Sequence, residues 1–167
     1  MKKLDNILGE EIISKLQRVS QSVIYGNESN NIFNRDIIAI TSADGYTEVF
    51  NKLNEYKVEG EVINEFYIIR YNVGDYIRKH NDVWDTKRSF KRTRSLVVQL
   101  SDPSTYRGGN TIVYDIKDKP YDLSKKVDSG MIFDSTLDHE VCTLQAGVRY
   151  SLVACYERGK AGLLLGE

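Results

Sequence analysis

Apolar positions in the first part of the chain recur at the spacing of an α-helix. They predict an amphipathic helix near the start of the chain and a second over residues 47–56. The intervening stretch "IIAIT", residues 37–41, consists largely of β-branched residues and predicts a strand. The positions that define the first helix are Leu4, Ile7, Leu8, Ile12, Leu16 and Val19.

The pattern changes to short strands from about residue 65 onward. The predicted strands are rich in β-branched and aromatic residues, and turn-forming segments such as "NVGD" and "KDKPYD" separate them. Helices followed by a run of strands predict an α+β fold. We expect a single domain over residues 1–167, with helical support in 1–60 and a β core in 65–157. The strand segments are "EFYIIRY", "YIRKHND", "RSLVVQL", "NTIVYD", "SGMIFD", "HEVCTL" and "VRYSLVACYE".

Composition narrows the functional classes. The chain is 41% hydrophobic and 28% charged, with a net charge of −1, so no overall field favours nucleic acid or a membrane surface. The two cysteines, Cys142 and Cys155, have no metal-binding or redox spacing. We expect both to be buried free thiols in a reducing compartment, which predicts a cytoplasmic protein. The sequence does not predict an oligomeric state.

The candidate chemistry involves both histidines of the chain. His80 lies two residues before Asp82, and His139 follows much later. Two imidazoles and one carboxylate form the facial triad of non-haem iron oxygenases. The run "HEVCTLQAGVRYS" predicts a hairpin that turns at Gly147 and places Arg149 on the strand next to His139. A cationic arginine there can bind a carboxylate through paired hydrogen bonds.

The order of these motifs resembles a known family. The pattern "Y-x-x-G…H-x-D…G-G-x-T…H…G-x-R-x-S" is similar to the iron(II)/2-oxoglutarate-dependent dioxygenases, and most similar to their prolyl 4-hydroxylase-like branch. The resemblance covers residues 66–157. The positions that carry it are Tyr71, Gly74, His80, Asp82, Gly108, Gly109, His139, Gly147, Arg149 and Ser151.

The resemblance implies a double-stranded β-helix, or jelly roll, with the N-terminal helices packed on one sheet. Fe(II) would be held by His80 and Asp82 together with His139 from the facing sheet. Arg149 would bind the distal carboxylate of the cosubstrate 2-oxoglutarate, and Tyr71 and Ser151 would add hydrogen bonds. O2 would be the second cosubstrate, and ascorbate is a further candidate cofactor.

Two positions depart from the family pattern. Ile77 stands where an aromatic residue often precedes the first metal-binding histidine. Gln99 stands where an aromatic residue often lines the cosubstrate pocket. Both bear on the shape of the pocket rather than on the metal ligands.

The segment from Val83 to Arg94 follows Asp82 and therefore starts at the rim of the expected iron pocket. It is rich in lysine and arginine, and it predicts either a lid over the substrate or a solvated connection. As a lid it would offer Trp84, Arg88 and Phe90 as substrate contacts. Its charge would favour a substrate with acidic flanks.

Four functions compete. The resemblance favours hydroxylation of an unactivated C–H bond in a prolyl residue of a protein or peptide. A free amino acid or another small molecule is the alternative substrate. Nucleobase demethylation is less favoured, because Cys155 occupies the position where that subfamily carries a second arginine. A non-enzymatic jelly-roll binding module would need neither the triad nor Arg149.

Overall fold

The protein, described by a computed structural model over residues 1–40, 45–83 and 92–159, contains two α-helices and thirteen β-strands within these ranges. The helices are α1 (Glu10–Ser22) and α2 (Thr47–Asn54). The strands are β1 (Lys2–Leu4), β2 (Gly26–Ser29), β3 (Phe33–Ala39), β4 (Glu61–Tyr71), β5 (Tyr76–His80), β6 (Arg92–Gln99), β7 (Tyr106–Gly108), β8 (Thr111–Tyr114), β9 (Pro120–Asp122), β10 (Gly130–Asp134), β11 (His139–Val141), β12 (Leu144–Gly147) and β13 (Arg149–Arg158).

Both predicted helices are present, and the first begins later than its apolar spacing suggests. Residues 2–4 form β1, which pairs with β10. The turn into α1 is held by Asp128, whose carboxylate accepts hydrogen bonds from the backbone N–H groups of Leu8 and Gly9 at 2.8 and 2.9 Å. The apolar residues before Glu10 therefore contribute to the core from a strand and a turn, not from a helix.

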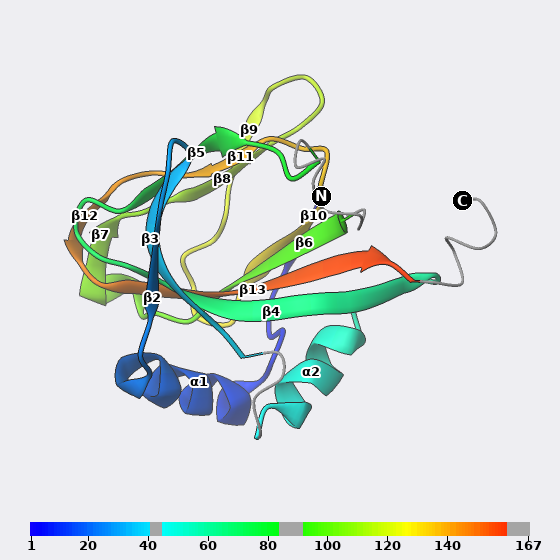
Figure 1. Ribbon diagram of the computed structural model, residues 1–167, viewed down its shortest axis with the longest axis horizontal. Helices are drawn as coiled ribbons and strands as arrows, with labels where there is room; N and C mark the ends of the chain where they lie inside the picture. Colours follow the sequence, from blue (N-terminus) through cyan, green and yellow to red (C-terminus); the bar gives the residue numbers. More distant parts are fainter. Residues whose placement is uncertain (41–44, 84–91, 160–167) are drawn as a thin grey trace.

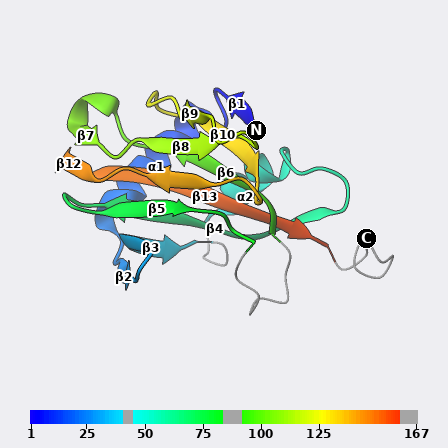
Figure 2. The ribbon, with the colours of Figure 1, turned by 90° about the horizontal axis from the view of Figure 1, so that it is seen from above.

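Eleven of the described strands form one curled sheet with the order β1-β10-β6-β13-β4-β3-β5-β11-β8-β9 and with β2 paired to β3. Every pairing is antiparallel. The sheet folds over so that β5, β11, β8 and β9 lie opposite β10, β6, β13 and β4, while α1 and α2 cover the outer face of the second layer (Figures 1 and 2). This is the predicted helix-supported jelly roll.

Strand β3 connects the two layers. Phe33 and Asn34 pair with β5, whereas residues 36–39 of the same strand pair with β4. The sequence predicted a strand at 37–41, and the observed strand starts four residues earlier, at Phe33. Its inner face therefore forms one wall of the space between the layers.

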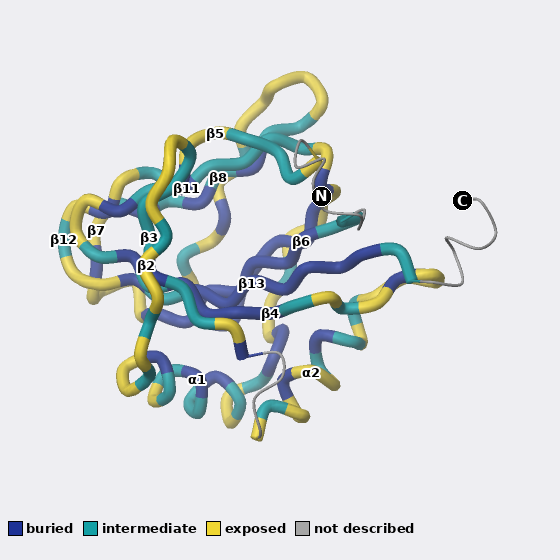
Figure 3. Tube along the Cα trace, viewed as in Figure 1, coloured by how far each residue is buried: buried dark blue, intermediate teal, exposed yellow. Residues whose placement is uncertain are grey.

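The alternation of side chains along β4 separates two hydrophobic cores. Phe66 and Ile68 belong to the core beneath the helices, together with residues of α1 and α2. Tyr67, Ile69 and Tyr71 belong to the core between the two layers. Because successive strand residues point to opposite faces, one strand serves both cores. Both faces of β4 and β13 are accordingly buried near their centres (Figure 3).

One predicted connection is wrong. His139 and Arg149 do not lie on neighbouring strands of a hairpin, because β11 pairs with β5 and β8, whereas β13 pairs with β4 and β6. The intervening β12 pairs with β7 in a separate two-stranded sheet. Gly147 does turn the chain with a positive φ of 77°, and an added Cβ there would lie 2.1 Å from the Thr105 carbonyl oxygen.

Cys142 and Cys155 are both free thiols, and Cys155 is buried as predicted while Cys142 is half-buried. Among the described residues, neither helix has the length and apolar character needed to cross a lipid bilayer.

Candidate metal centre and cosubstrate pocket

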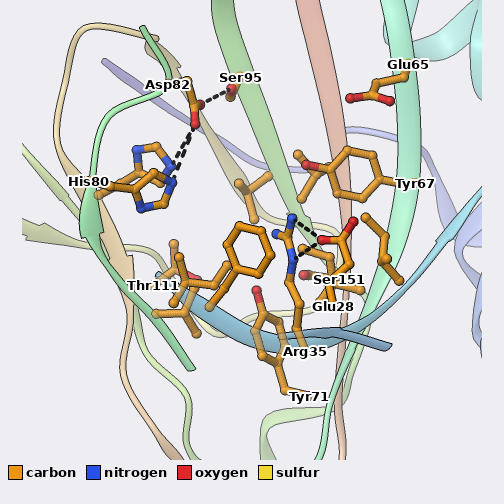
Figure 4. A pocket seen from close by; sticks show the side chains of 18 of the residues that line it. Glu28, Arg35, Glu65, Tyr67, Tyr71, His80, Asp82, Ser95, Thr111 and Ser151 are labelled. Carbon is orange, nitrogen blue, oxygen red and sulfur yellow. Dashed lines mark hydrogen bonds and ion pairs between the residues drawn. The ribbon is translucent and has the colours of Figure 1, made fainter. Parts of the chain in front are cut away.

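His80, Asp82 and His139 lie close enough together to hold one metal ion. Figure 4 shows His80 and Asp82 side by side at one end of the cavity between the layers. Nε2 of His80 lies 3.5 Å from Oδ1 of Asp82, and Nε2 of His139 lies 3.7 Å from the same oxygen. One potential ligand atom from each residue falls within 4.8 Å of the others. The two histidines lie on adjacent strands of one layer, so the expectation that His139 comes from the facing sheet is wrong.

Backbone carbonyl groups orient both imidazoles. Nδ1 of His80 lies 2.7 Å from the Arg78 carbonyl oxygen, and Nδ1 of His139 lies 3.2 Å from that of Leu137. Since a carbonyl oxygen only accepts hydrogen bonds, each Nδ1 carries the proton in this arrangement. Each Nε2 is then left with a lone pair that points toward the shared oxygen of Asp82.

At Asp82 and His139 the electrostatics favour the protonation states that bind metals. Burial raises the pKa of Asp82, but its interactions with the nearby His80, His139 and Arg92 outweigh it and hold the pKa below its ordinary value. Burial lowers the pKa of His139, which favours the neutral imidazole. A carboxylate and neutral imidazoles are the ligand forms for a divalent ion. The three residues therefore fit Fe(II).

Two residues that the sequence did not reveal hold the second oxygen of Asp82. Ser95 donates its hydroxyl to Oδ2 at 3.2 Å, and Nη1 of Arg92 lies 3.3 Å from the same atom. Arg92 also contacts Glu65 through Nη2 at 3.4 Å. Oδ1 is thereby left facing the imidazoles, and Oδ2 is turned toward β6.

The Arg149 side chain is completely buried and has no carboxylate partner within the described residues. It donates to Oε1 of Gln99 through Nε at 3.3 Å and Nη2 at 3.0 Å, and to Oγ1 of Thr111 at 2.8 Å. Its guanidinium lies 5.0 Å from the centre of the Tyr71 ring. A buried cation with only neutral partners is costly unless an anion neutralises it.

Unpaired polar atoms gather around this cation. In the described part of the chain, Nη1 of Arg149, the hydroxyl of Ser151 and the hydroxyl of Tyr106 are buried without a hydrogen-bond partner. The Arg149 and Tyr71 backbones are direct partners across β13 and β4. The predicted trio Arg149, Tyr71 and Ser151 is therefore assembled, and its unpaired donors suit a carboxylate.

A cavity of about 460 Å³ joins the two groups. It is lined by His80, Asp82 and His139 and also by Tyr71, Thr111 and Ser151. Its volume is in the range of ordinary small-molecule sites, roughly 300–1,000 Å³.

The sequence did not identify Gln99, Thr111 and Tyr106 as neighbours of Arg149, although Thr111 is the threonine of the G-G-x-T motif. Gln99 was singled out only as a departure from an aromatic pattern. The structure explains why a polar residue stands at this position of β6. The amide oxygen of Gln99 accepts hydrogen bonds from the Arg149 guanidinium.

The predicted substrate contacts Trp84, Arg88 and Phe90 lie outside the described residues. The basic segment itself ends earlier than predicted. Arg92 and Arg94 belong to β6, where Arg92 contacts Asp82 and Arg94 pairs with Glu61 at 2.6 Å. Those two arginines are therefore not part of a solvated loop or lid.

A family model described as the 2OG-Fe(II) oxygenase superfamily matches residues 66–157, which is more than half of the chain. Among curated proteins, an uncharacterized fowlpox virus protein, FPV006/FPV255, is 27% identical over 137 residues. That alignment covers 82% of this chain and only 29% of the viral protein.

Solved structures share the fold. A Pseudomonas putida prolyl-4-hydroxylase superposes with a TM-score of 0.74 at 18% identity, over 95% of this chain and 92% of that one. The viral collagen prolyl hydroxylase of Paramecium bursaria Chlorella virus-1 gives 0.71 at 15%, over 95% and 96%. A Trichoplax adhaerens prolyl hydroxylase, in complex with a hypoxia inducible factor peptide fragment, gives 0.72 at 19%, over 98% and 86%.

Proposed function

Since the chain belongs to the 2OG-Fe(II) oxygenase superfamily, we propose that it is an Fe(II)- and 2-oxoglutarate-dependent dioxygenase that hydroxylates a prolyl residue in a protein or peptide. One observation supports the chemistry most directly. A His-Asp-His cluster lines the same cavity as Tyr71 and Thr111. These two residues contact Arg149, which is buried and has no carboxylate partner among the described residues.

In this proposal Nε2 of His80, Nε2 of His139 and Oδ1 of Asp82 hold the metal. When bound, Fe(II) would supply the redox chemistry that couples oxidation of 2-oxoglutarate to hydroxylation of the substrate. The protein would supply the geometry. Carbonyl groups fix both imidazoles, and Ser95 and Arg92 hold Oδ2 so that Oδ1 remains toward the metal.

Arg149 would bind the distal carboxylate of 2-oxoglutarate. Its unpaired Nη1 and the unpaired hydroxyl of Ser151 supply donors, and Tyr71 adds its ring and hydroxyl beside them. Gln99 and Thr111 would hold the guanidinium in place from the other side. The carboxylate would neutralise a buried cation that has no carboxylate partner among the described residues.

A prolyl residue is the favoured target because the structural neighbours named as prolyl hydroxylases match nearly the whole chain, and one of them holds a peptide. A free amino acid or other small molecule is the alternative, and the cavity volume of about 460 Å³ supports it. A peptide substrate requires the cavity to bind a peptide main chain, whereas a free amino acid does not.

The proposal is tested by loading purified protein with Fe(II) and 2-oxoglutarate under air, with and without ascorbate. We expect succinate to form slowly without substrate and faster with blocked prolyl peptides, whose product gains one oxygen atom in mass spectrometry. Free amino acids form the comparison set. Absence of 2-oxoglutarate-dependent succinate from wild-type protein, under conditions where metal is bound, would contradict the proposed activity.

A further inference from the structure

An ion pair that the metal and cosubstrate sites do not use lies inside the cavity. Phe33, Arg35, Ile37 and Ala39 alternate along β3 and all line the cavity, so Arg35 is a charged residue on an otherwise apolar inner face. Its partner Glu28 is directly opposite on β2 and lines the same cavity (Figure 4).

The pair uses only part of its hydrogen-bonding capacity. Nε and Nη2 of Arg35 both donate to Oε2 of Glu28, at 3.2 and 3.1 Å. The guanidinium carbon lies 4.3 Å from the centre of the Phe33 ring and 5.8 Å from that of Tyr67, within the range of cation–π attraction. Nη1 of Arg35 and Oε1 of Glu28 make no hydrogen bond to other described residues.

Both unused atoms remain accessible. The side chains are 13% and 39% exposed, and neither atom is among the fully buried unpartnered ones. The cavity-lining pair therefore has one donor and one acceptor that are unused and accessible, beside the Phe33 and Tyr67 rings.

A purely structural role explains this arrangement poorly. An ion pair with an exposed partner contributes little net stability, at most about 1 kcal/mol. Even buried ion pairs are often replaced by apolar residues of similar size without loss. The inner face of β3 is apolar on both sides of Arg35, so an apolar residue would continue the pattern. The charged pair suits recognition of a ligand.

The ligand that this pair fits is neutral and offers both an acceptor and a donor. An isolated anion would meet the repulsion of Glu28 as well as the attraction of Arg35. One residue of an extended peptide presents its N–H and its C=O on the same side, as in a hydrogen-bonded antiparallel pair. Its C=O would accept from Nη1 of Arg35, and its N–H would donate to Oε1 of Glu28.

We propose that the Glu28–Arg35 pair binds the main chain of the peptide substrate at a residue next to the target proline. Proline has no N–H, so the residue that hydrogen-bonds to the pair must be a neighbour and not the proline itself. This inference rests on the proposed prolyl hydroxylase function and assigns the part of the cavity that distinguishes a peptide from a free amino acid.

The test uses a blocked alanine-rich peptide with one central proline. Two further versions carry an N-methyl group on the residue before or after the proline, which removes that N–H. With wild-type protein, one of the two methylated peptides should lose about tenfold to a hundredfold in peptide-dependent kcat/KM, as expected for one hydrogen bond to a charged group. With Glu28→Ala, the parent peptide should already show that loss, and methylation should cost less than about twofold more.

Glu48→Ala is the matched control, because it removes an exposed glutamate from another ion pair, that with Lys15 on the helix side. It should keep the wild-type sensitivity to methylation. Thermal unfolding verifies that each variant is folded. If Glu28→Ala does not fold, Glu28→Gln is used instead. It should lower kcat/KM for the parent peptide, and N-methylation should then lower kcat/KM by less than it does in wild type.

Suppose that the peptide is hydroxylated, but N-methylation does not lower kcat/KM, or lowers it equally in wild type and in the Glu28 variant. That result would overturn this inference and leave the proposed function standing. Succinate formation without hydroxylation of any peptide would contradict the prolyl-peptide function and this inference together.

Discussion

His80 and His139 are direct partners across the β5–β11 ladder, with ring centres 4.5 Å apart. Their separation along the chain is closed by strand pairing rather than by a local turn. Each Nδ1 faces a carbonyl oxygen two residues earlier in its own strand region. The pairing therefore presents two oriented Nε2 atoms to one point, independently of any bound ion.

Replacing His80 by Ala should remove one of these two nitrogens and leave the β5–β11 backbone pairing in place. We expect Mn(II) or Co(II) affinity to fall by more than the roughly 10- to 100-fold typical of an outer-shell change. Calorimetric titration under anaerobic conditions measures this. Asp118→Asn, which alters an exposed carboxylate paired with Lys79, is the control and should bind metal normally. Unchanged affinity in His80→Ala would remove His80 from the site.

Arg149→Ala should raise the apparent KM for 2-oxoglutarate by about thirtyfold to several thousandfold, since breaking a buried charged pair costs roughly 2–5 kcal/mol. Metal affinity should change little, because the guanidinium contacts Gln99 and Thr111 rather than the three candidate ligands. Steady-state succinate assays at saturating Fe(II), combined with metal titration, separate the two effects. A variant with the wild-type dependence on 2-oxoglutarate would place the carboxylate site elsewhere.

Local patterns predicted much of the fold. Alternation identified most strands of the β core, and helical spacing identified both α1 and α2, although α1 begins only at Glu10 and not near Leu4. Strand partners were harder to predict. The segment "HEVCTLQAGVRYS" has the local features of a hairpin. In the structure, however, β12, which begins at Leu144, pairs with β7, and β13 pairs with β4 and β6. The choice of strand partner depends on which surfaces are buried against distant parts of the chain, and a short segment carries no information about those contacts.

The same limit applies to the site. His80, Asp82, His139 and Arg149 were predicted because their types and spacing resemble a family pattern. Ser95 was not, because a serine in a buried strand has no local signal until its hydroxyl is seen 3.2 Å from Asp82. Residues that orient ligands act through contacts between distant segments, and their sequence context is ordinary.

Ser95→Ala and Arg92→Gln should each weaken metal binding by about 10- to 100-fold without removing a ligand. The physical reason is that Oδ2 of Asp82 loses one of its two fixed contacts, so the carboxylate can rotate away from the imidazoles. Arg107→Gln, an exposed arginine outside the cavity, is the control. Titration with Mn(II) alone measures the effect independently of turnover. Wild-type affinity in both variants would show that these contacts do not position the ligand.

Acid stability should depend on Glu61. Its carboxylate is buried and accepts hydrogen bonds from Arg94 Nε at 2.9 Å and Nη2 at 2.6 Å, from Thr93 at 2.7 Å and from the Val58 N–H at 3.0 Å. Burial raises the pKa of Glu61, but these hydrogen bonds outweigh it and leave the pKa below its ordinary value.

A carboxyl group with a lowered pKa in the folded state stabilises the protein above its unfolded pKa of about 4.3, and this stabilisation is lost as the pH falls through the folded value. Arg94→Met should therefore lower the free energy of unfolding near neutral pH by about 3–5 kcal/mol, because it leaves a buried carboxylate without its cation. The deficit should shrink on acidification, since protonation relieves the unpaired charge. Urea unfolding followed from about pH 7 to about pH 4 measures the difference, with Arg107→Met as the exposed control. A deficit that stays constant across this range would show that Arg94 stabilises the fold through packing alone.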